Sequence, residues 1–163
     1  MPAPTEILST ENDHRLEQAI MPDGSLIQVK VPLLEEPSPE VSQAGLSKWG
    51  YEQSLIGAIF SMMGGAPEHR MYSLPEAEGF MRAPEGLVNP FEVQNDKMGY
   101  IDLNYLANWI EETVGDPELA EGIRSITAQQ TAYGRAMPFV KSLLQERIAA
   151  YRQCVADEAV SSN

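Results

Sequence analysis

The residues of this chain best suited to acid–base or metal chemistry are two histidines and a single cysteine. His14 follows Glu11 at the spacing of a Glu-x-x-His metal motif, but such sites need a second motif and further carboxylates projecting from neighbouring helices. Cys154 has no second cysteine with which to form a disulfide or a zinc finger. We therefore expect no metal site and no bound cofactor.

A second group of polar residues, His69, Arg70 and Tyr72, follows the glycine pair Gly64-Gly65 in a predicted loop. A loop histidine can act as a general acid or base, so these three residues are a candidate polar site. The sequence offers them no partnered nucleophile and no second positioned histidine. An enzyme that acts alone is therefore disfavoured, and the alternative is a small enzyme subunit that contributes these residues to a shared active site.

Charge narrows the choice of partners. The chain carries 24 acidic and 11 basic residues, a net charge of −13, spread along its whole length. Binding to nucleic acid needs clustered Lys and Arg, which are missing, and an anionic membrane surface would repel the chain. No apolar run is long enough to cross a membrane, and the acidic N-terminus lacks the features of a signal peptide. We expect a cytoplasmic protein that attracts a basic-surfaced protein partner.

The N-terminal third is predicted to be poor in helix. Residues 1–15 form a flexible arm, and residues 16–32 form a β-hairpin because alternating apolar residues flank the turn sequence Pro22-Asp23-Gly24. Residues 33–46 contain two prolines and three glutamates and are expected to be an extended connector.

The remainder is predicted to be a helical domain over residues 47–158, followed by a tail over 159–163. Apolar residues recur at helical spacing, and Ser or Asp stands at each predicted start except the last, where Pro138 is taken as the helix starter. The predicted helices cover 48–63, 74–81, 103–114 and 137–157, and a further helix begins at Pro117 and ends before a break around Thr131–Gly134. The fold class is mainly α (α+β): an antiparallel bundle of about four to five helices with one N-terminal hairpin and an extended arm.

Apolar residues on irregular or marginal elements are the candidates for partner contact. An isolated hairpin is marginal in water, so its apolar face must pack on the helices or pair with a partner. Methionine suits adaptable binding surfaces, and a loop as long as 83–100 is typically functional or docked. The predicted partner-binding residues are Ile27, Val29, Val31, Met71, Met81, Leu87, Val88, Phe91 and Met98.

These features together favour a non-catalytic accessory subunit, adaptor or assembly factor that binds a larger protein through its arm, its hairpin and the 83–100 loop. A homo-oligomer is left open. An acidic mimic of nucleic acid, acting as an inhibitor, is a weaker alternative. It would need carboxylates in spaced rows, whereas the helical acids here alternate with Arg and Lys.

Overall fold

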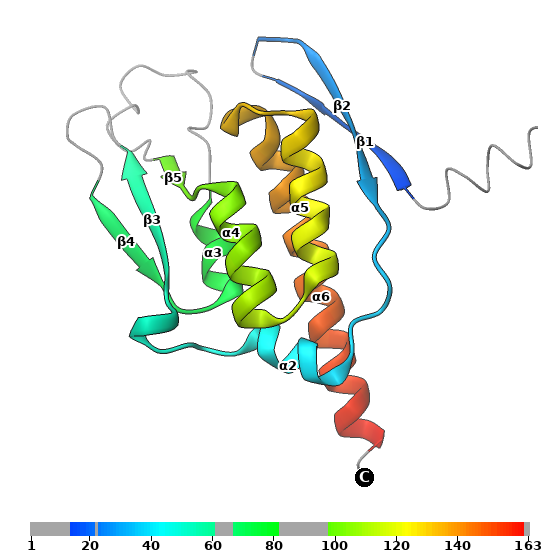
Figure 1. The fold of residues 1–163 in the computed structure, drawn as a ribbon. Coiled ribbons are helices and arrows are strands. Elements are labelled where there is room, and N and C mark those ends of the chain that lie inside the picture. The colour runs from blue at the N-terminus through cyan, green and yellow to red at the C-terminus, as the bar shows by residue number, and fades with distance from the viewer. Residues whose placement is uncertain (1–13, 22, 61–66, 82–97, 162–163) are drawn as a thin grey trace, which may run out of the picture.

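The computed structural model describes residues 14–21, 23–60, 67–81 and 98–161, and in this part of the chain the fold is α+β. A β-hairpin lies against one side of a group of helices, and a three-stranded antiparallel sheet flanks the other side (Figure 1). Helix α2 (Pro39–Leu46) packs under the group against α6 (Tyr133–Ser161). The predicted antiparallel bundle is not confirmed.

The predicted hairpin is confirmed. Strand β1 (His14–Ile20) pairs antiparallel with β2 (Leu26–Pro32), with Gln18 opposite Gln28. In the turn, the Asp23 carboxylate accepts hydrogen bonds from the Ser25 backbone N–H and hydroxyl at 2.9 and 2.6 Å. Gly24 takes the left-handed conformation, with φ at 88°, which glycine adopts without steric cost. Hence the turn chemistry visible in the sequence sets the register. The first two strand residues, His14 and Arg15, had been assigned to the arm, and residues 1–13 of that arm lie outside the described residues.

The connector is extended only in its first part, which corrects the prediction for 33–46. Residues 39–46 form helix α2 (Pro39–Leu46). The Ser38 hydroxyl accepts a hydrogen bond from the Val41 backbone N–H at 3.2 Å, and Pro39 occupies the first turn. Proline at this position starts a helix because its missing N–H has no intrahelical partner there anyway. The Ser-Pro-Glu pattern, which predicts a break in the chain, is therefore the start of a helix.

The central helix predicted over 48–63 is wrong. This stretch holds a 3₁₀ turn (Tyr51–Gln53) and strand β3 (Leu55–Phe60), and Ser47, expected to begin a helix, instead ends α2. Strand β3 is the middle strand of the sheet, between β4 (Glu68–Met71) and β5 (Met98–Tyr100). A short apolar run fits a buried strand as well as a helix, and here its isoleucines favour the strand.

Gly57 explains how tightly β3 is packed. A Cβ at this position would lie 2.7 Å from the Phe80 ring and 2.8 Å from the Tyr100 carbonyl oxygen. The glycine therefore lets the strand approach its neighbours closely, a common role for glycine inside a strand.

Three helices agree with the sequence pattern. They are α3 (Leu74–Phe80), α4 (Leu103–Trp109), which continues as a π turn (Ile110–Val114), and α5 (Pro117–Gln129). Their first turns are capped by the side chains of Ser73, Asp102 and Asp116. A side-chain oxygen at this position satisfies an N–H that has no helical partner. Gly115, with φ at 81°, separates α4 and its π turn from α5.

The last helix is longer than predicted. Helix α6 (Tyr133–Ser161) has 29 residues and contains Pro138, which therefore lies inside the helix rather than starting it. The tail expected from residue 159 is helical as far as Ser161. A proline near the start of a helix removes one backbone hydrogen bond but leaves the helix intact when tertiary packing supports it. Phe139 and Val140, directly after Pro138, are both buried.

One buried polar cluster joins the start of α5 to the middle of α6. Asp116 and Arg147 are 2% and 5% exposed, and Tyr151 is fully buried. The Arg147 guanidinium donates to both Asp116 carboxylate oxygens, from Nε at 2.8 Å and from Nη2 at 3.1 Å, while the Tyr151 hydroxyl donates to Oδ2. The other oxygen also accepts the Leu119 backbone N–H at 3.2 Å. We call Asp116, Arg147 and Tyr151 the buried cluster.

The buried cluster shifts the titration of its members. Burial disfavours the charged carboxylate of Asp116, but the hydrogen bonds from Arg147 and Tyr151 outweigh it and hold the pKa of Asp116 below its ordinary value. Burial, with the neighbouring carboxylate, raises the pKa of the Tyr151 phenol. The cluster is therefore an ion pair with a neutral tyrosine at neutral pH.

The cluster also reaches the connector and α2. Arg147 Nη1 donates to the Glu35 carbonyl oxygen at 2.6 Å, and the Glu35 N–H donates to the Glu118 carboxylate at 3.0 Å. Gly45, in α2, lies so close to the Tyr151 ring that a Cβ there would overlap it. The connector, α2, α5 and α6 thus meet at a single point.

Asp116→Asn should remove a pH-dependent part of the stability. Because the pKa of Asp116 is lower in the folded chain, its contribution is complete above the ordinary value of 3.8 and is lost as the pH falls through the folded pKa. We expect the parent to lose stability below about pH 4 by a component that the variant lacks, and the variant to be about 1–3 kcal/mol less stable at pH 7.

Urea unfolding between pH 2.5 and 7 measures both effects. Asp102→Asn is the matched control, because Asp102 is an exposed helix cap and asparagine caps a helix as well as aspartate does. Equal pH dependence in Asp116→Asn and the parent would contradict the assignment.

Candidate functional site

Five of the predicted partner-binding residues are in the core. Ile27, Val29 and Val31 are buried on the face of β2 that packs toward α5, and Met71 and Met81 are buried at the ends of β4 and α3. The hairpin therefore satisfies its own apolar face, and the two methionines fill the core rather than a surface. This corrects the expectation that these side chains contact a partner, because a buried side chain is not available to one in this fold.

The other predicted contacts fall largely outside the described residues. Leu87, Val88 and Phe91 belong to 82–97, which the structure does not describe. Met98 begins β5, and its side chain is likewise not described. A contact role for these four residues stays a prediction.

The candidate polar site of His69, Arg70 and Tyr72 does not form one site. The His69 ring stacks on Phe80 with centroids 4.9 Å apart. Arg70 lies over the Tyr51 ring at 4.0 Å and donates to the Ser54 hydroxyl at 2.9 Å.

His69 and Arg70 are neighbours on β4, so their side chains leave opposite faces of the sheet. Tyr72 follows the strand, and its N–H donates to the Glu76 carboxylate at 2.8 Å. The structure gives each of these residues a packing or hydrogen-bonding role, and it does not gather them around a shared space.

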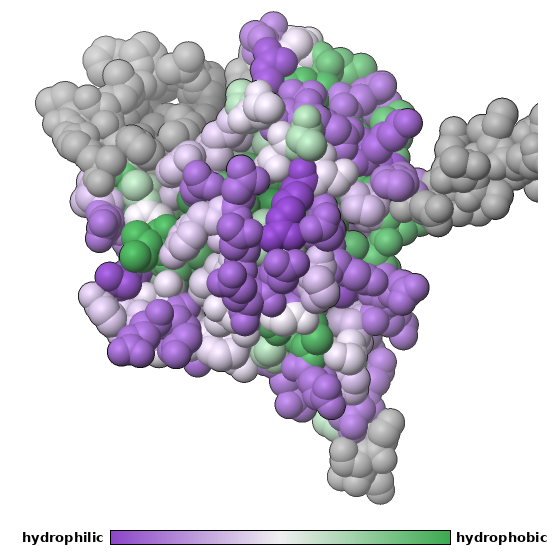
Figure 2. Space-filling view, viewed as in Figure 1, coloured by the Kyte–Doolittle hydropathy of each residue, from purple (hydrophilic) through white to green (hydrophobic). Residues whose placement is uncertain are grey.

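The outer face of the hairpin is exposed and carries three aliphatic side chains among polar ones, which are His14, Gln18, Gln28 and Lys30. Leu16, Ile20 and Leu26 are 57%, 76% and 55% exposed, and Ile20 pairs directly with Leu26. Figure 2 shows hydrophobic patches among hydrophilic residues at the hairpin, whereas the surface over α4 and α5 is mostly hydrophilic. Exposed aliphatic residues on neighbouring strands are typical of a surface that contacts another protein.

Strand β1 has a free edge, which follows from the hydrogen bonding of its partner strand. On β2, the Lys30 N–H and carbonyl bond to the side-chain amide of Gln129, at 2.8 and 2.7 Å, so even-numbered residues direct their backbone groups away from β1. By the antiparallel register, the even residues of β1 likewise direct theirs outward. Within the described part of the chain, the N–H and carbonyl groups of Leu16, Gln18 and Ile20 have no hydrogen-bond partner. We call this row, with the exposed Leu16 and Ile20 side chains, the β1 edge.

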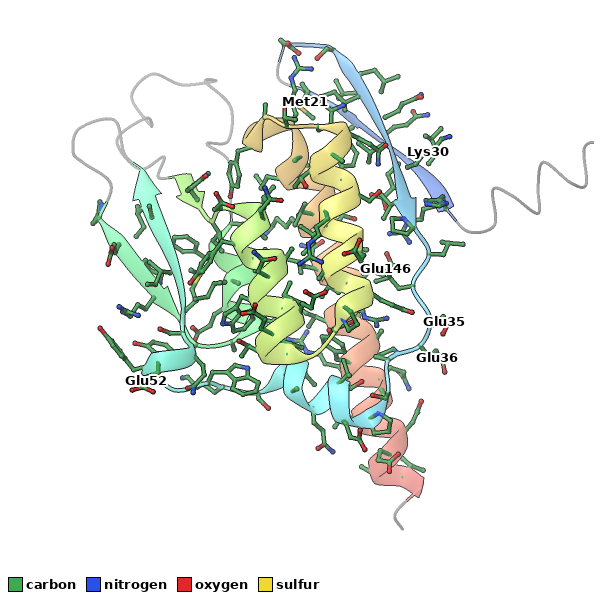
Figure 3. All side chains as sticks on the ribbon, viewed as in Figure 1. Met21, Lys30, Glu35, Glu36, Glu52 and Glu146 are labelled. Carbon is green, nitrogen blue, oxygen red and sulfur yellow. The ribbon has the colours of Figure 1, made fainter. Side chains whose placement is uncertain are left out.

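Side chains hold the hairpin against the helices and so keep the β1 edge in place. Arg15 donates to both carboxylate oxygens of Glu146 on α6, and Asp23 lies 4.0 Å from Arg135. The hydrogen bonds from Arg15 hold the pKa of Glu146 below its ordinary value. Figure 3 shows Lys30, Glu146 and Glu35 following one another along this side of the molecule.

A cleft of about 450 Å³ lies where β5, α4, α5 and the start of α6 meet. It is lined by Tyr100, Asp102, Leu103, Asn104, Arg124, Thr127, Ala128, Thr131 and Tyr133. The Tyr100 and Tyr133 rings meet at 4.6 Å with a tilt of 59°, and the Tyr133 hydroxyl donates to the Gly99 carbonyl at 2.9 Å. Burial raises the pKa of Tyr133 to about 12, so this phenol stays neutral at physiological pH. The volume is typical of a pocket for a small molecule or a side chain.

The charges beside the cleft are mostly negative. Arg124 is held by the carboxylates of Glu111 and Glu121, at 3.3 and 2.6 Å, and by the Asn108 amide oxygen at 2.7 Å. These contacts raise the pKa of Arg124, and the two carboxylates balance its positive charge. Asp102, also in the lining, has an exposed carboxylate.

The described residues contain no group of three or more His, Cys, Asp or Glu side chains placed to hold a metal ion. Among the helices of the described ranges, none is both long and apolar enough to cross a membrane. Comparison with protein-family models, with curated proteins and with solved structures finds no match to this chain.

The sequence predicts that the hairpin offers an edge strand to a partner, but it does not single out β1, and it gives no signal for the cleft. Leu16 and Ile20 alternate with Gln18, which is a period-two signal, whereas the predicted contact residues Ile27, Val29 and Val31 lie on the other face of the hairpin. The cleft gathers single residues from four elements, and no local pattern links Tyr100 to Thr127 or Tyr133.

Gln129→Ala should free the second edge of the hairpin. It removes both hydrogen bonds to the Lys30 backbone, so we expect the free energy of unfolding to fall by about 1–2 kcal/mol, measured by urea unfolding. Gln130→Ala is the matched control. Its side chain makes no hydrogen bond within the described residues, so a change under about 0.5 kcal/mol is expected. Equal effects of the two variants would show that the Gln129 amide does not hold β2.

Proposed function

We propose that the chain is a non-catalytic accessory subunit or adaptor that binds a larger protein through the β1 edge. The observation that supports this most is the combination on one strand of unpaired backbone groups and exposed aliphatic side chains at Leu16 and Ile20. An extended segment of a partner would pair with the edge as an added strand. Main-chain hydrogen bonds supply affinity in this mode, and alternate side chains supply specificity.

The rigidity of the hairpin supports this mode of binding. A strand that is already fixed loses little conformational entropy when a partner adds to it. Arg15 and Gln129 tie the two strands of the hairpin to α6 and α5, respectively. Strand β1, which has the free edge, is seven residues long. Proteins usually block such an edge with charged residues, proline or a covering element. Here the outward-facing side chains of β1 are His14, Leu16, Gln18 and Ile20, and two of these four are aliphatic.

Charge supports a basic partner. The net charge of −13 attracts a positive surface over a distance and speeds its encounter. Carboxylates lie near the hairpin side of the molecule: Glu35 and Glu36 on the connector, and Glu118 and Glu121 around a groove formed with Pro32 and Leu33. These carboxylates add to the negative charge on the hairpin side that a basic partner would approach.

Gln18→Pro tests the backbone pairing. Proline removes the outward N–H of Gln18, which has no partner in the described hairpin, so folding should be nearly unaffected. Proteins that the full chain captures from its native host at low salt are identified first, and their affinity for each variant is then measured. We expect Gln18→Pro to weaken binding by about tenfold and Gln18→Ala to leave it within about twofold.

Ile20→Lys tests the apolar contact, with Val160→Lys as its control. Both residues are exposed to a similar extent, 76% and 74%, but Val160 lies near the end of α6. We expect Ile20→Lys to weaken binding by about tenfold or more and Val160→Lys to change it by less than about twofold. If the two lysine variants bind alike and Gln18→Pro binds like the parent, the β1 edge is not the docking site.

A further inference from the structure

We infer that the cleft between β5, α4 and α5 binds a guanidinium group, the side chain of an arginine on the protein partner. This inference rests on the proposed function, because it names the chemistry by which that partner is recognised. The site lies apart from the β1 edge and is built from other residues, with Tyr100, Asp102 and Thr127 in its lining.

The first reason is an available carboxylate. Asp102 uses Oδ1 to accept the Tyr105 backbone N–H at 3.0 Å, which caps α4. Its Oδ2 makes no hydrogen bond to the residues that the structure describes, and the side chain is exposed at the cleft. A carboxylate oxygen in this position accepts a charge-assisted hydrogen bond from a cationic donor.

The second reason is the end of helix α5. The last backbone hydrogen bond there runs from the Gln130 N–H to the Ile126 carbonyl at 2.9 Å. The next two carbonyls, of Thr127 and Ala128, therefore have no helical partner, and both residues line the cleft. Carbonyls at a helix C-terminus carry the negative end of the helix dipole and favour a cation.

The third reason is the pair of tyrosine rings. Tyr100 and Tyr133 meet at 4.6 Å on one side of the cleft, and Tyr133 stays neutral at physiological pH. The face of such a ring attracts a guanidinium group, which also stacks on it because it is planar.

An anionic ligand is disfavoured by the same surroundings. Arg124 is the cation of the lining, and Glu111, Glu121 and Asn108 already accept its hydrogen bonds. With Asp102, the carboxylates near the cleft outnumber this one cation. The charged group of the lining that has no ion pair among the described residues is thus an acceptor, the Asp102 carboxylate, and a guanidinium, which has several donors and no acceptor, matches it.

Nuclear magnetic resonance titration of the full chain with N-acetyl-arginine methylamide tests the site. The amide signals of Tyr100, Asp102, Thr127, Thr131 and Tyr133 should shift together, with a dissociation constant on the order of 1 mM, as expected for a single side chain. N-acetyl-citrulline methylamide has nearly the same shape without the charge, and it should bind roughly tenfold more weakly.

Two matched pairs of variants locate the binding. Asp102→Asn keeps the helix cap but removes the charge, and should weaken arginine binding roughly tenfold, whereas Asn104→Asp should not weaken it. Tyr100→Leu should weaken binding and Tyr100→Phe should preserve it, because phenylalanine keeps the aromatic face. Thermal unfolding of each variant checks that it is folded.

The outcomes separate the two proposals. Equal binding of the arginine and citrulline derivatives, an unchanged affinity in Asp102→Asn, or no shifts at these residues up to about 50 mM probe overturns the guanidinium site. Because no partner is present in this titration, its failure leaves the β1 edge untouched. Arginine binding together with unimpaired partner capture by Gln18→Pro would instead reject the edge and retain the cleft.

Discussion

The arrangement of this fold depends on one buried charge, the carboxylate of Asp116. An isolated buried charge is too costly to persist, so Asp116 requires the Arg147 guanidinium, the Tyr151 hydroxyl and the Leu119 N–H around it. Arg147 in turn needs an acceptor for its remaining nitrogen, which it finds in the Glu35 carbonyl. Satisfying one charge therefore fixes the relative positions of α5, α6 and the connector. Removing either charged partner should harm the fold more than replacing both with apolar groups of similar size, because it leaves a lone charge buried.

Helix α5 carries this constraint to the two candidate surfaces. Its N-terminus is anchored by Asp116, and its C-terminal turn holds the hairpin through Gln129 and lines the cleft through Thr127. The buried side of β2 packs toward the same helix. Helix α5, with 13 residues, thus helps to position both the β1 edge and the cleft, and its own position is set by the buried cluster. A partner that occupies both surfaces would bind a preorganised pair of sites rather than order them on binding.

Features that depend on neighbouring residues could be predicted from the sequence, whereas features that depend on packing partners distant in the sequence could not. The Asp23-Gly24 turn and the caps at Ser73 and Asp102 act within a few residues, and the structure contains them as predicted. The run around Gly57 has an apolar spacing that suits both a helix and a strand, and only the sheet partners, distant in sequence, decide for a strand. The burial of Ile27 and Met71, which the sequence predicts as contact residues, likewise depends on which distant elements cover them. The two candidate surfaces depend on which side chains are exposed and on how distant elements pair and pack. Neither can be derived from a short stretch of the sequence.

Amide hydrogen exchange, resolved by residue along β1, reports which backbone groups of the hairpin are free. Glu17 and Ala19 should be protected through their pairing with β2, whereas Leu16, Gln18 and Ile20 should exchange rapidly in the chain alone. On addition of the partner, those three amides should become protected. Protection of Leu16, Gln18 and Ile20 already in the isolated monomer would rule out a free β1 edge, because it would show that the chain itself covers that edge.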